Sequence, residues 1–303
     1  MSAIEFTNVV KRYGTVTALN DISFTVERGE MFGLIGPDGA GKTTAIRAMC
    51  GLLHTDGGTI RMLGKDPVKQ HRALTSSIGY LSQRFSLYGD LSIDENIAFF
   101  AEIHGLRDYQ TRRTQLLEMT RLTPFRARLA DQLSGGMKQK LALACTLIHE
   151  PEVIVLDEPT TGVDPVSRRE FWKLLSQFLA SGITIVMSTP YLDEAERCAH
   201  IALLHEGKVL ALDRPEHLRA QLPGTLFEVM VDEPRAAVAR LSGQSAVASA
   251  QVFGDRLHVW VEERDPAIAE QRLRGAAGDA AITPTHIRHI VPSLEDVFIA
   301  RIS

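Results

Sequence analysis

The sequence has 303 residues, of which 45% are hydrophobic and 23% are charged. This balance is typical of a globular protein and excludes a disordered or fibrous chain, and the length allows one large domain plus an added module. The formal net charge of −4 offers no basic surface, so we expect no nucleic-acid partner. The three cysteines are far apart without CxxC pairing, which favours small buried side chains over a disulfide or metal site.

Short β-rich runs alternate with longer helical patterns through residues 1–222, which is typical of an α/β domain. Two helical patterns stand together without a strand between them, and they predict a helical subdomain at about residues 84–150. The predicted strands cover residues 4–10, 22–26, 31–35, 153–156, 183–187, 201–204 and 208–212. The predicted helices cover residues 42–53, 93–104, 109–122 and 137–149.

A second domain is predicted at residues 223–303. Its boundary is marked by Pro223-Gly224, and no lysine occurs after Lys208 although arginines continue. The order of its elements, strand–helix–strand–strand–helix–strand–helix, indicates a small α+β domain and is compatible with a ferredoxin-like one. Its strands are predicted at residues 226–231, 246–252, 257–261 and 282–290, and its helices at residues 235–241, 267–273 and 294–302.

A glycine-rich loop between the strand at 31–35 and the helix at 42–53 satisfies the phosphate-loop pattern. Glycines let backbone N–H groups close around phosphates, and the following helix N-terminus adds positive dipole. In such a loop Lys42 reaches the terminal phosphates and the Thr43 hydroxyl can bind magnesium. The predicted nucleotide-binding residues here are Gly36, Pro37, Asp38, Gly39, Ala40, Gly41, Lys42, Thr43 and Thr44.

Two carboxylates, Asp157 and Glu158, directly follow the apolar strand at 153–156. Open α/β sheets place their ligands at the carboxyl ends of parallel strands, so we expect this pair to lie beside the phosphate loop. Adjacent residues of a strand point apart, which allows two roles. Asp157 is predicted to hold magnesium and Glu158 to polarise the attacking water.

The run Leu133-Ser134-Gly135-Gly136 resembles the signature motif of the ABC ATPase family, and it opens the predicted helix at 137–149. A serine hydroxyl and glycine N–H groups at a helix N-terminus form an anion site. In the family this site faces the ATP held by the other subunit, so the resemblance implies a second nucleotide-binding domain, as a homodimer or a heterodimer. It also implies ATP and Mg²⁺ as ligands.

Further positions match the family pattern. Tyr13 corresponds to an aromatic residue that stacks on adenine, Gln83 to a glutamine that contacts magnesium and links the core to the helical subdomain, and Asp164 to the aspartate of the D-loop. The tail Pro292-Ser293-Leu294-Glu295-Asp296-Val297-Phe298 resembles drug-efflux-type members that serve ABC-2-type permeases. The resemblance therefore implies an ATP-hydrolysing subunit that powers export, cytoplasmic and peripheral on the inner face of the membrane.

The sequence departs from the family pattern at the switch histidine, where it has Pro190. Proline has no side-chain donor and no backbone N–H, so it cannot bond the terminal phosphate. Met137 also stands in place of the signature's final glutamine, and Asp38 replaces a common asparagine. Two interpretations stay open: slow hydrolysis by a homodimer, or a mainly ATP-binding half of a heterodimer.

The segment from Arg84 to Asp90 also has two interpretations. Its aromatic and apolar residues are candidates for contact with a permease helix, and they are equally suited to the core of the helical subdomain. Other classes of ABC ATPase are disfavoured, because the chain has no long coiled-coil insertion and only one set of nucleotide-binding motifs.

Overall fold

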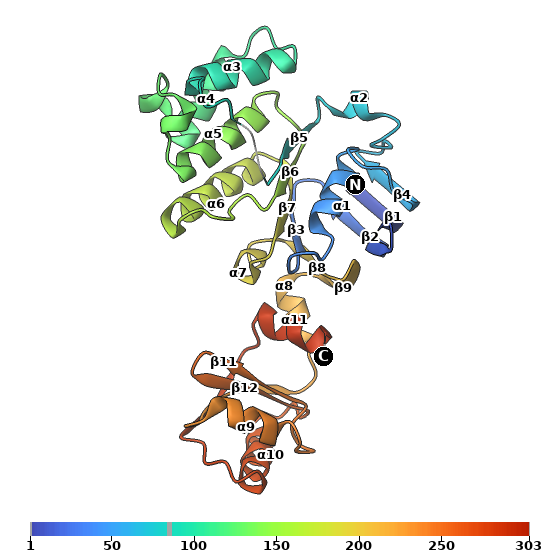
Figure 1. The fold of residues 1–303 in the computed structure, drawn as a ribbon, viewed down its shortest axis with the longest axis vertical. Helices are drawn as coiled ribbons and strands as arrows, with labels where there is room; N and C mark the ends of the chain where they lie inside the picture. The colour runs from blue at the N-terminus through green and yellow to red at the C-terminus, as the bar shows by residue number, and fades with distance from the viewer. Residues whose placement is uncertain (1, 84–86, 303) are drawn as a thin grey trace. The chain divides into compact units, whose positions relative to one another are not determined.

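The computed structural model describes residues 2–83 and 87–302. The chain divides into two compact units, Met1–Pro215 and Glu216–Ser303 (Figure 1). The division falls at helix α8 (Pro215–Ala220), shortly before the boundary predicted from Pro223-Gly224. No helix among the described residues is long and apolar enough to cross a bilayer.

A six-stranded sheet forms the centre of the first unit, in the order β5-β6-β7-β3-β8-β9. Its strands are parallel except for β9. They are β3 (Met31–Ile35), β5 (Ile78–Leu81), β6 (Val153–Asp157), β7 (Thr184–Thr189), β8 (His200–His205) and β9 (Lys208–Asp213). Every residue of β3, β6 and β7 is buried, which explains their continuous apolar sequences.

A three-stranded antiparallel sheet lies beside the central one and consists of β2 (Val16–Glu27), β1 (Ser2–Tyr13) and β4 (Gly57–Met62). Helix α1 (Lys42–Met49) contacts strands of both sheets, and their buried apolar residues form one core. The helix is shorter than predicted because Gly51 adopts φ 70° and its N–H bonds the carbonyl of Ala48, which closes the C-terminus.

The predicted helical subdomain contains α3 (Ile93–Ile103), α4 (Gln110–Thr120), two short 3₁₀ turns (Thr123–Phe125 and Ala130–Gln132) and α5 (Gly135–Leu147). A capping box of Ser92 and Glu95 begins α3. Helix α5 contacts α3, α4 and β5, and also packs on α6 (Pro165–Ala180), so it connects the subdomain to the core. Two shorter helices complete this unit, α2 (His71–Leu74) and α7 (Leu192–Ala195).

The second unit has the βαββαβ order of a ferredoxin-like fold, as the predicted elements suggested. Its four strands are antiparallel and lie in the order β11-β12-β10-β13. The elements are β10 (Thr225–Met230), α9 (Pro234–Leu241), β11 (Ser249–Phe253), β12 (Arg256–Val261), α10 (Pro266–Asp279), β13 (His286–Ile290) and the final α11 (Leu294–Ile302). The core lies between one face of this sheet and helices α9 and α10.

Candidate functional site

The phosphate loop connects β3 to α1, as predicted, and two of its glycines cannot be replaced without a clash. A Cβ on Gly36 would lie 2.2 Å from the carbonyl oxygen of Leu204. Gly41, at the N-terminus of α1, has φ 103°, and its Cβ would lie 2.4 Å from the carbonyl oxygen of Ala18. Glycine is therefore required at both positions for the loop to pack against β2 and β8.

Lys42 points into this loop and is only 4% exposed. Its Nζ donates to the carbonyl oxygens of Gly36 (2.8 Å) and Pro37 (3.0 Å). The same ammonium lies 3.1 Å from Oε1 of Glu158. The two residues that the sequence placed in phosphate binding and water activation therefore meet in the structure.

Asp157 ends β6 and is 1% exposed. Its Oδ1 accepts hydrogen bonds from the hydroxyls of Ser188 (2.7 Å) and Thr43 (3.1 Å). Burial raises the pKa of this carboxyl above its ordinary value, and the neighbouring charge of Glu158 adds to the rise, while the two hydroxyl bonds oppose it. A bound cation would relieve this cost by compensating the buried charge.

Thr43 and Asp157 fit a magnesium ion, because a hydroxyl and a carboxylate oxygen are hard ligands and lie 3.1 Å apart at the edge of the phosphate loop. Gln83 lies near these two ligands, because its side-chain amide donates to Oε2 of the adjacent Glu158 at 3.1 Å. No cluster of three or more His, Cys, Asp or Glu that could hold a metal occurs among residues 2–83 and 87–302. A magnesium ion here would therefore complete its shell with phosphate oxygens and water.

Glu158 has an unusual backbone conformation, with φ 48°, in the left-handed region. Its N–H donates to the carbonyl oxygen (3.2 Å) and the hydroxyl (3.0 Å) of Ser188. Its Oε2 accepts from Gln83 (3.1 Å) and Thr161 (3.3 Å). Such strain persists where the surroundings enforce it, and here it aims the carboxylate at the phosphate loop.

Ser188 is a site residue that the sequence analysis did not identify. It lies in β7, is fully buried, and bridges Asp157 and the backbone of Glu158. The signal was its position at the carboxyl end of a parallel strand adjacent to β6. Pro190 follows two residues later, directly after β7.

The other predicted nucleotide-binding residues differ in their exposure. Tyr13 ends β1, is 49% exposed, and has the ammonium of Lys11 5.3 Å from its ring centre. Asp38 is exposed within the phosphate loop, whereas Ala40 is buried. Thr44 lies half-buried in the first turn of α1.

The signature residues lie at the N-terminus of α5. Ser134 caps this helix by accepting a bond from the N–H of Met137 at 3.3 Å, and both Ser134 and Gly135 are exposed. Gly136 is buried, and a Cβ there would lie 2.2 Å from the hydroxyl oxygen of Ser167 in α6. The first turn of α5 is therefore seated directly on the first turn of α6.

The start of α6 carries Asp164, which caps the helix by accepting from the N–H groups of Val166 and Ser167, both at 3.0 Å. The bonds from Ser167 are the largest cause that lowers the pKa of the Asp164 carboxyl. Val166 beside it is 70% exposed.

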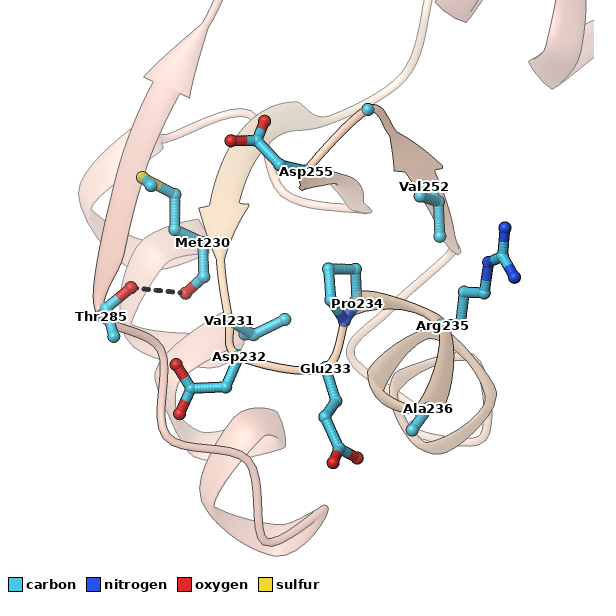
Figure 2. Close-up of a pocket in the computed structure, with 11 residues that line it drawn as sticks. Met230, Val231, Asp232, Glu233, Pro234, Arg235, Ala236, Val252, Asp255 and Thr285 are labelled. Atoms are coloured by element: carbon cyan, nitrogen blue, oxygen red, sulfur yellow. Dashed lines mark hydrogen bonds between the residues drawn. The ribbon is translucent and has the colours of Figure 1, made fainter.

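A cavity of about 790 Å³ lies in the second unit, at one end of its sheet (Figure 2). The side chains around it include three carboxylates, Asp232, Glu233 and Asp255, and one cation, Arg235. They do not converge on one point in Figure 2, and no nucleotide-binding motif contributes to the cavity. We therefore assign the nucleotide chemistry to the phosphate loop in the first unit.

The loop, the buried carboxylate pair and the helix-capping signature together define an ATPase of the ABC type. Residues 19–161 match the family described as ABC transporter. The chain is 35% identical to the Nod factor export ATP-binding protein I of Burkholderia orbicola over 99% of this chain and 96% of that protein. The chain therefore belongs to the family of ABC transporter ATP-binding proteins.

Two further similarities support this assignment. The chain is 46% identical to the probable multidrug ABC transporter ATP-binding protein YbhF of Escherichia coli over 69% of this chain, but it covers only 37% of that longer relative. A solved structure, the dimeric form of the bacterial ABC transporter cassette MJ0796, is 26% identical to this chain with a TM-score of 0.62, and the match covers 70% of this chain and 98% of that one.

Proposed function

We propose that this chain binds and hydrolyses ATP·Mg²⁺ to power export through a separate ABC-2-type permease. The observation that carries the proposal is the contact of Lys42 with Glu158 at 3.1 Å beside Asp157 and Thr43. It brings together a phosphate-binding cation, a general-base carboxylate and the ligands for a divalent cation.

Each residue has a separate task in this proposal. Lys42 and the loop N–H groups would bind the terminal phosphates, and Tyr13 would stack on adenine. Thr43 and Asp157, with Gln83, would hold Mg²⁺, which when bound supplies positive charge to the phosphates. Glu158 would accept a proton from the attacking water, and its bonds from Gln83 and Thr161 fix the carboxylate that does so.

A second chain would complete the site. Ser134 and Gly135 form an exposed anion site at the N-terminus of α5, whose first turn is seated on α6. The relative titled as a dimeric cassette supports pairing of two such domains. ATP would then be held between the phosphate loop of one chain and the signature helix of the other, and closure would be passed to the permease.

The permease and export are supported by the relatives, whose names describe multidrug transport and Nod factor export. The second of them aligns with 99% of this chain, which includes the tail from Pro292 to Phe298. We propose a peripheral location on the cytoplasmic face of the membrane. Tyr88 is a candidate permease contact, because it is 45% exposed and stacks edge-on against Phe99 at 4.5 Å. Its neighbours 84–86 lie outside the described residues.

A second candidate function is favoured by Pro190. In a heterodimer, a partner with the switch histidine would carry the catalytic site, and this chain would mainly bind ATP. Losing one positioned donor costs roughly 10²–10³ in rate, which is enough to make one of two sites nearly inactive.

The test is magnesium-dependent ATP hydrolysis by the purified chain, measured beside Lys42→Ala and Glu158→Gln. Turnover that both substitutions abolish supports the homodimer. No turnover, with ATP still bound in a Lys42-dependent way, supports the heterodimer. ATP binding that Lys42→Ala does not reduce would contradict both functions.

A further inference from the structure

One buried carboxylate outside the nucleotide site, that of Glu194, accepts four hydrogen bonds from side chains. Glu194 in α7 is 1% exposed. Its Oε1 accepts from the Thr160 hydroxyl (2.6 Å), the Arg168 Nε (2.6 Å) and the Trp172 indole N–H (3.3 Å). Its Oε2 accepts from the Thr189 hydroxyl at 2.6 Å. Four donors on one carboxylate offset the cost of burying its charge.

These donors come from three separate segments that border the nucleotide site. Thr160 lies in the loop after β6, two residues beyond Glu158. Thr189 ends β7 directly after Ser188. Arg168 and Trp172 belong to the first two turns of α6, the helix that Asp164 caps. A single carboxylate therefore ties together the loop of Glu158, the end of β7 and the start of α6.

The segment between Thr189 and Glu194 is fastened at both ends. Arg168 also donates to both oxygens of Asp193, at 3.1 and 3.0 Å, and its guanidinium lies 4.6 Å from the centre of the Tyr191 ring. The N–H of Tyr191 donates to the Thr189 hydroxyl at 3.1 Å. Pro190 lies between Thr189 and Tyr191, so contacts of its neighbours fix its position in the segment 189–194.

We propose that Glu194 is a positioning residue for ATP hydrolysis. This role of Glu194 rests on the proposed function, in which Glu158 activates water. The Glu194 carboxylate holds the loop that follows Glu158 and the end of β7 that carries Ser188, and it thereby fixes the positions of these two side chains. A displacement of about 1 Å at a catalytic group can cost about 100-fold in rate, so a loosened anchor affects turnover before it affects binding.

The experiment compares Glu194→Gln with Asp94→Asn in the full chain. Asp94 is a control for the loss of a carboxylate that an arginine binds: it accepts from the Arg126 guanidinium at 2.9 and 3.1 Å, is partly exposed, and lies in the helical subdomain. Glu194→Gln is expected to lower kcat by about 10- to 100-fold, with the ATP dissociation constant within about threefold. Glu194→Asp, which keeps the charge, is expected to recover part of the rate. Asp94→Asn should change neither constant by more than about twofold.

A second variant, Thr160→Val, tests the same network. If Glu194→Gln fails to fold, Thr160→Val removes one donor without changing side-chain size, and we expect kcat to fall about fivefold. A kcat within about twofold of the wild type in either folded variant would overturn the proposal.

Amide hydrogen exchange tests the coupling without turnover. In Glu194→Gln, exchange should quicken in all three donor segments, at residues 159–164, 165–172 and 186–189, as well as around residue 194, whereas Asp94→Asn should leave them unchanged. Exchange that quickens only around residue 194 would overturn the proposal. A wild-type chain without ATPase activity would count against the homodimer, and the exchange result would then decide the role of Glu194.

Discussion

The phosphate loop with its adjacent carboxylates and the N-terminus of α5 are two parts of the proposed ATP site. They differ in how far contacts within the same chain hold their functional groups in place. Lys42, Asp157 and Glu158 are all buried and bonded to one another or to Ser188. Ser134 and Gly135 are exposed, whereas Gly136 is buried where α5 is seated on α6.

This difference follows from what each part must bind. A charge that holds phosphate and metal must be kept in place by surrounding donors, because a buried carboxylate or ammonium is costly without partners. An anion site that serves another chain's nucleotide must stay open until that chain arrives. In the proposed site, the catalytic geometry is built within the chain, and a second chain completes it.

The largest expected effect is the loss of ATP turnover in Glu158→Gln, which changes the buried carboxylate beside the phosphate loop. The amide keeps the size of the side chain but cannot accept the proton of water, so turnover should fall by about 10²–10⁴ while ATP still binds. The measurement is steady-state hydrolysis beside nucleotide binding. Glu30→Gln is the control, because Glu30 bonds His200 at 2.7 Å at the opposite end of β3. Equal losses in both variants would argue against a special role for Glu158.

Pro190→His sharpens the comparison by adding a donor to the phosphate-loop side. We expect turnover to rise at least about 10-fold, since one positioned donor contributes roughly 10²–10³. Tyr191→His places the same residue one position further along and should have no such effect. Equal rates for the wild type and Pro190→His would show that the proline does not limit hydrolysis.

Gly136→Ala tests the seating of α5 on α6. The added methyl would lie 2.2 Å from the Ser167 hydroxyl, so the free energy of unfolding should fall by about 1–3 kcal/mol. Gly135→Ala meets no atom within 4 Å and should be neutral or slightly stabilising. Denaturant unfolding measures both, and Ser167→Gly should restore the stability of Gly136→Ala. A Gly136→Ala variant as stable as Gly135→Ala would contradict this packing.

Asp157→Asn has the smallest expected effect. It should stabilise the folded chain, whereas Gly136→Ala should destabilise it. Burial raises the folded-state pKa of Asp157, so the folded chain binds its proton more readily than the unfolded chain, and stability falls as pH rises through that interval. Without divalent cation at pH 7, asparagine should therefore raise Tm by about 2–4 °C.

The pH dependence provides the check on Asp157→Asn. Below the ordinary aspartate pKa of about 3.9, where both states are protonated, the difference in Tm should vanish. A lower Tm for the variant at pH 7 would mean that the negative charge stabilises the corner.

Much of the fold could be predicted because the central strands are long apolar runs bounded by glycines and charged residues. The strands β4 and β5 were missed, since Gly57–Met62 contains two glycines and Ile78–Leu81 has only four residues. Several other ends shifted: β13 begins at His286, later than predicted, and α10 continues to Asp279.

The site was predictable where one motif carries one function, as in the phosphate loop and the Asp157–Glu158 pair. The Glu194 network was not predictable from the sequence. Asp193-Glu194 looks like a solvated acidic pair, and the donors of Glu194 lie as far away in sequence as Thr160 and Arg168. The packing of α6 and α7 on β7 brings them together.

In the proposed mechanism, two chains complete one ATP site. The most direct test is light scattering of Glu158→Gln with ATP·Mg²⁺, beside the same variant with Ser134→Arg added. We expect ATP to double the mass of the first protein and to leave the second monomeric, although both bind nucleotide. A Glu158→Gln chain that binds ATP and remains monomeric, or a dimer that Ser134→Arg does not disturb, would contradict a site divided between two chains.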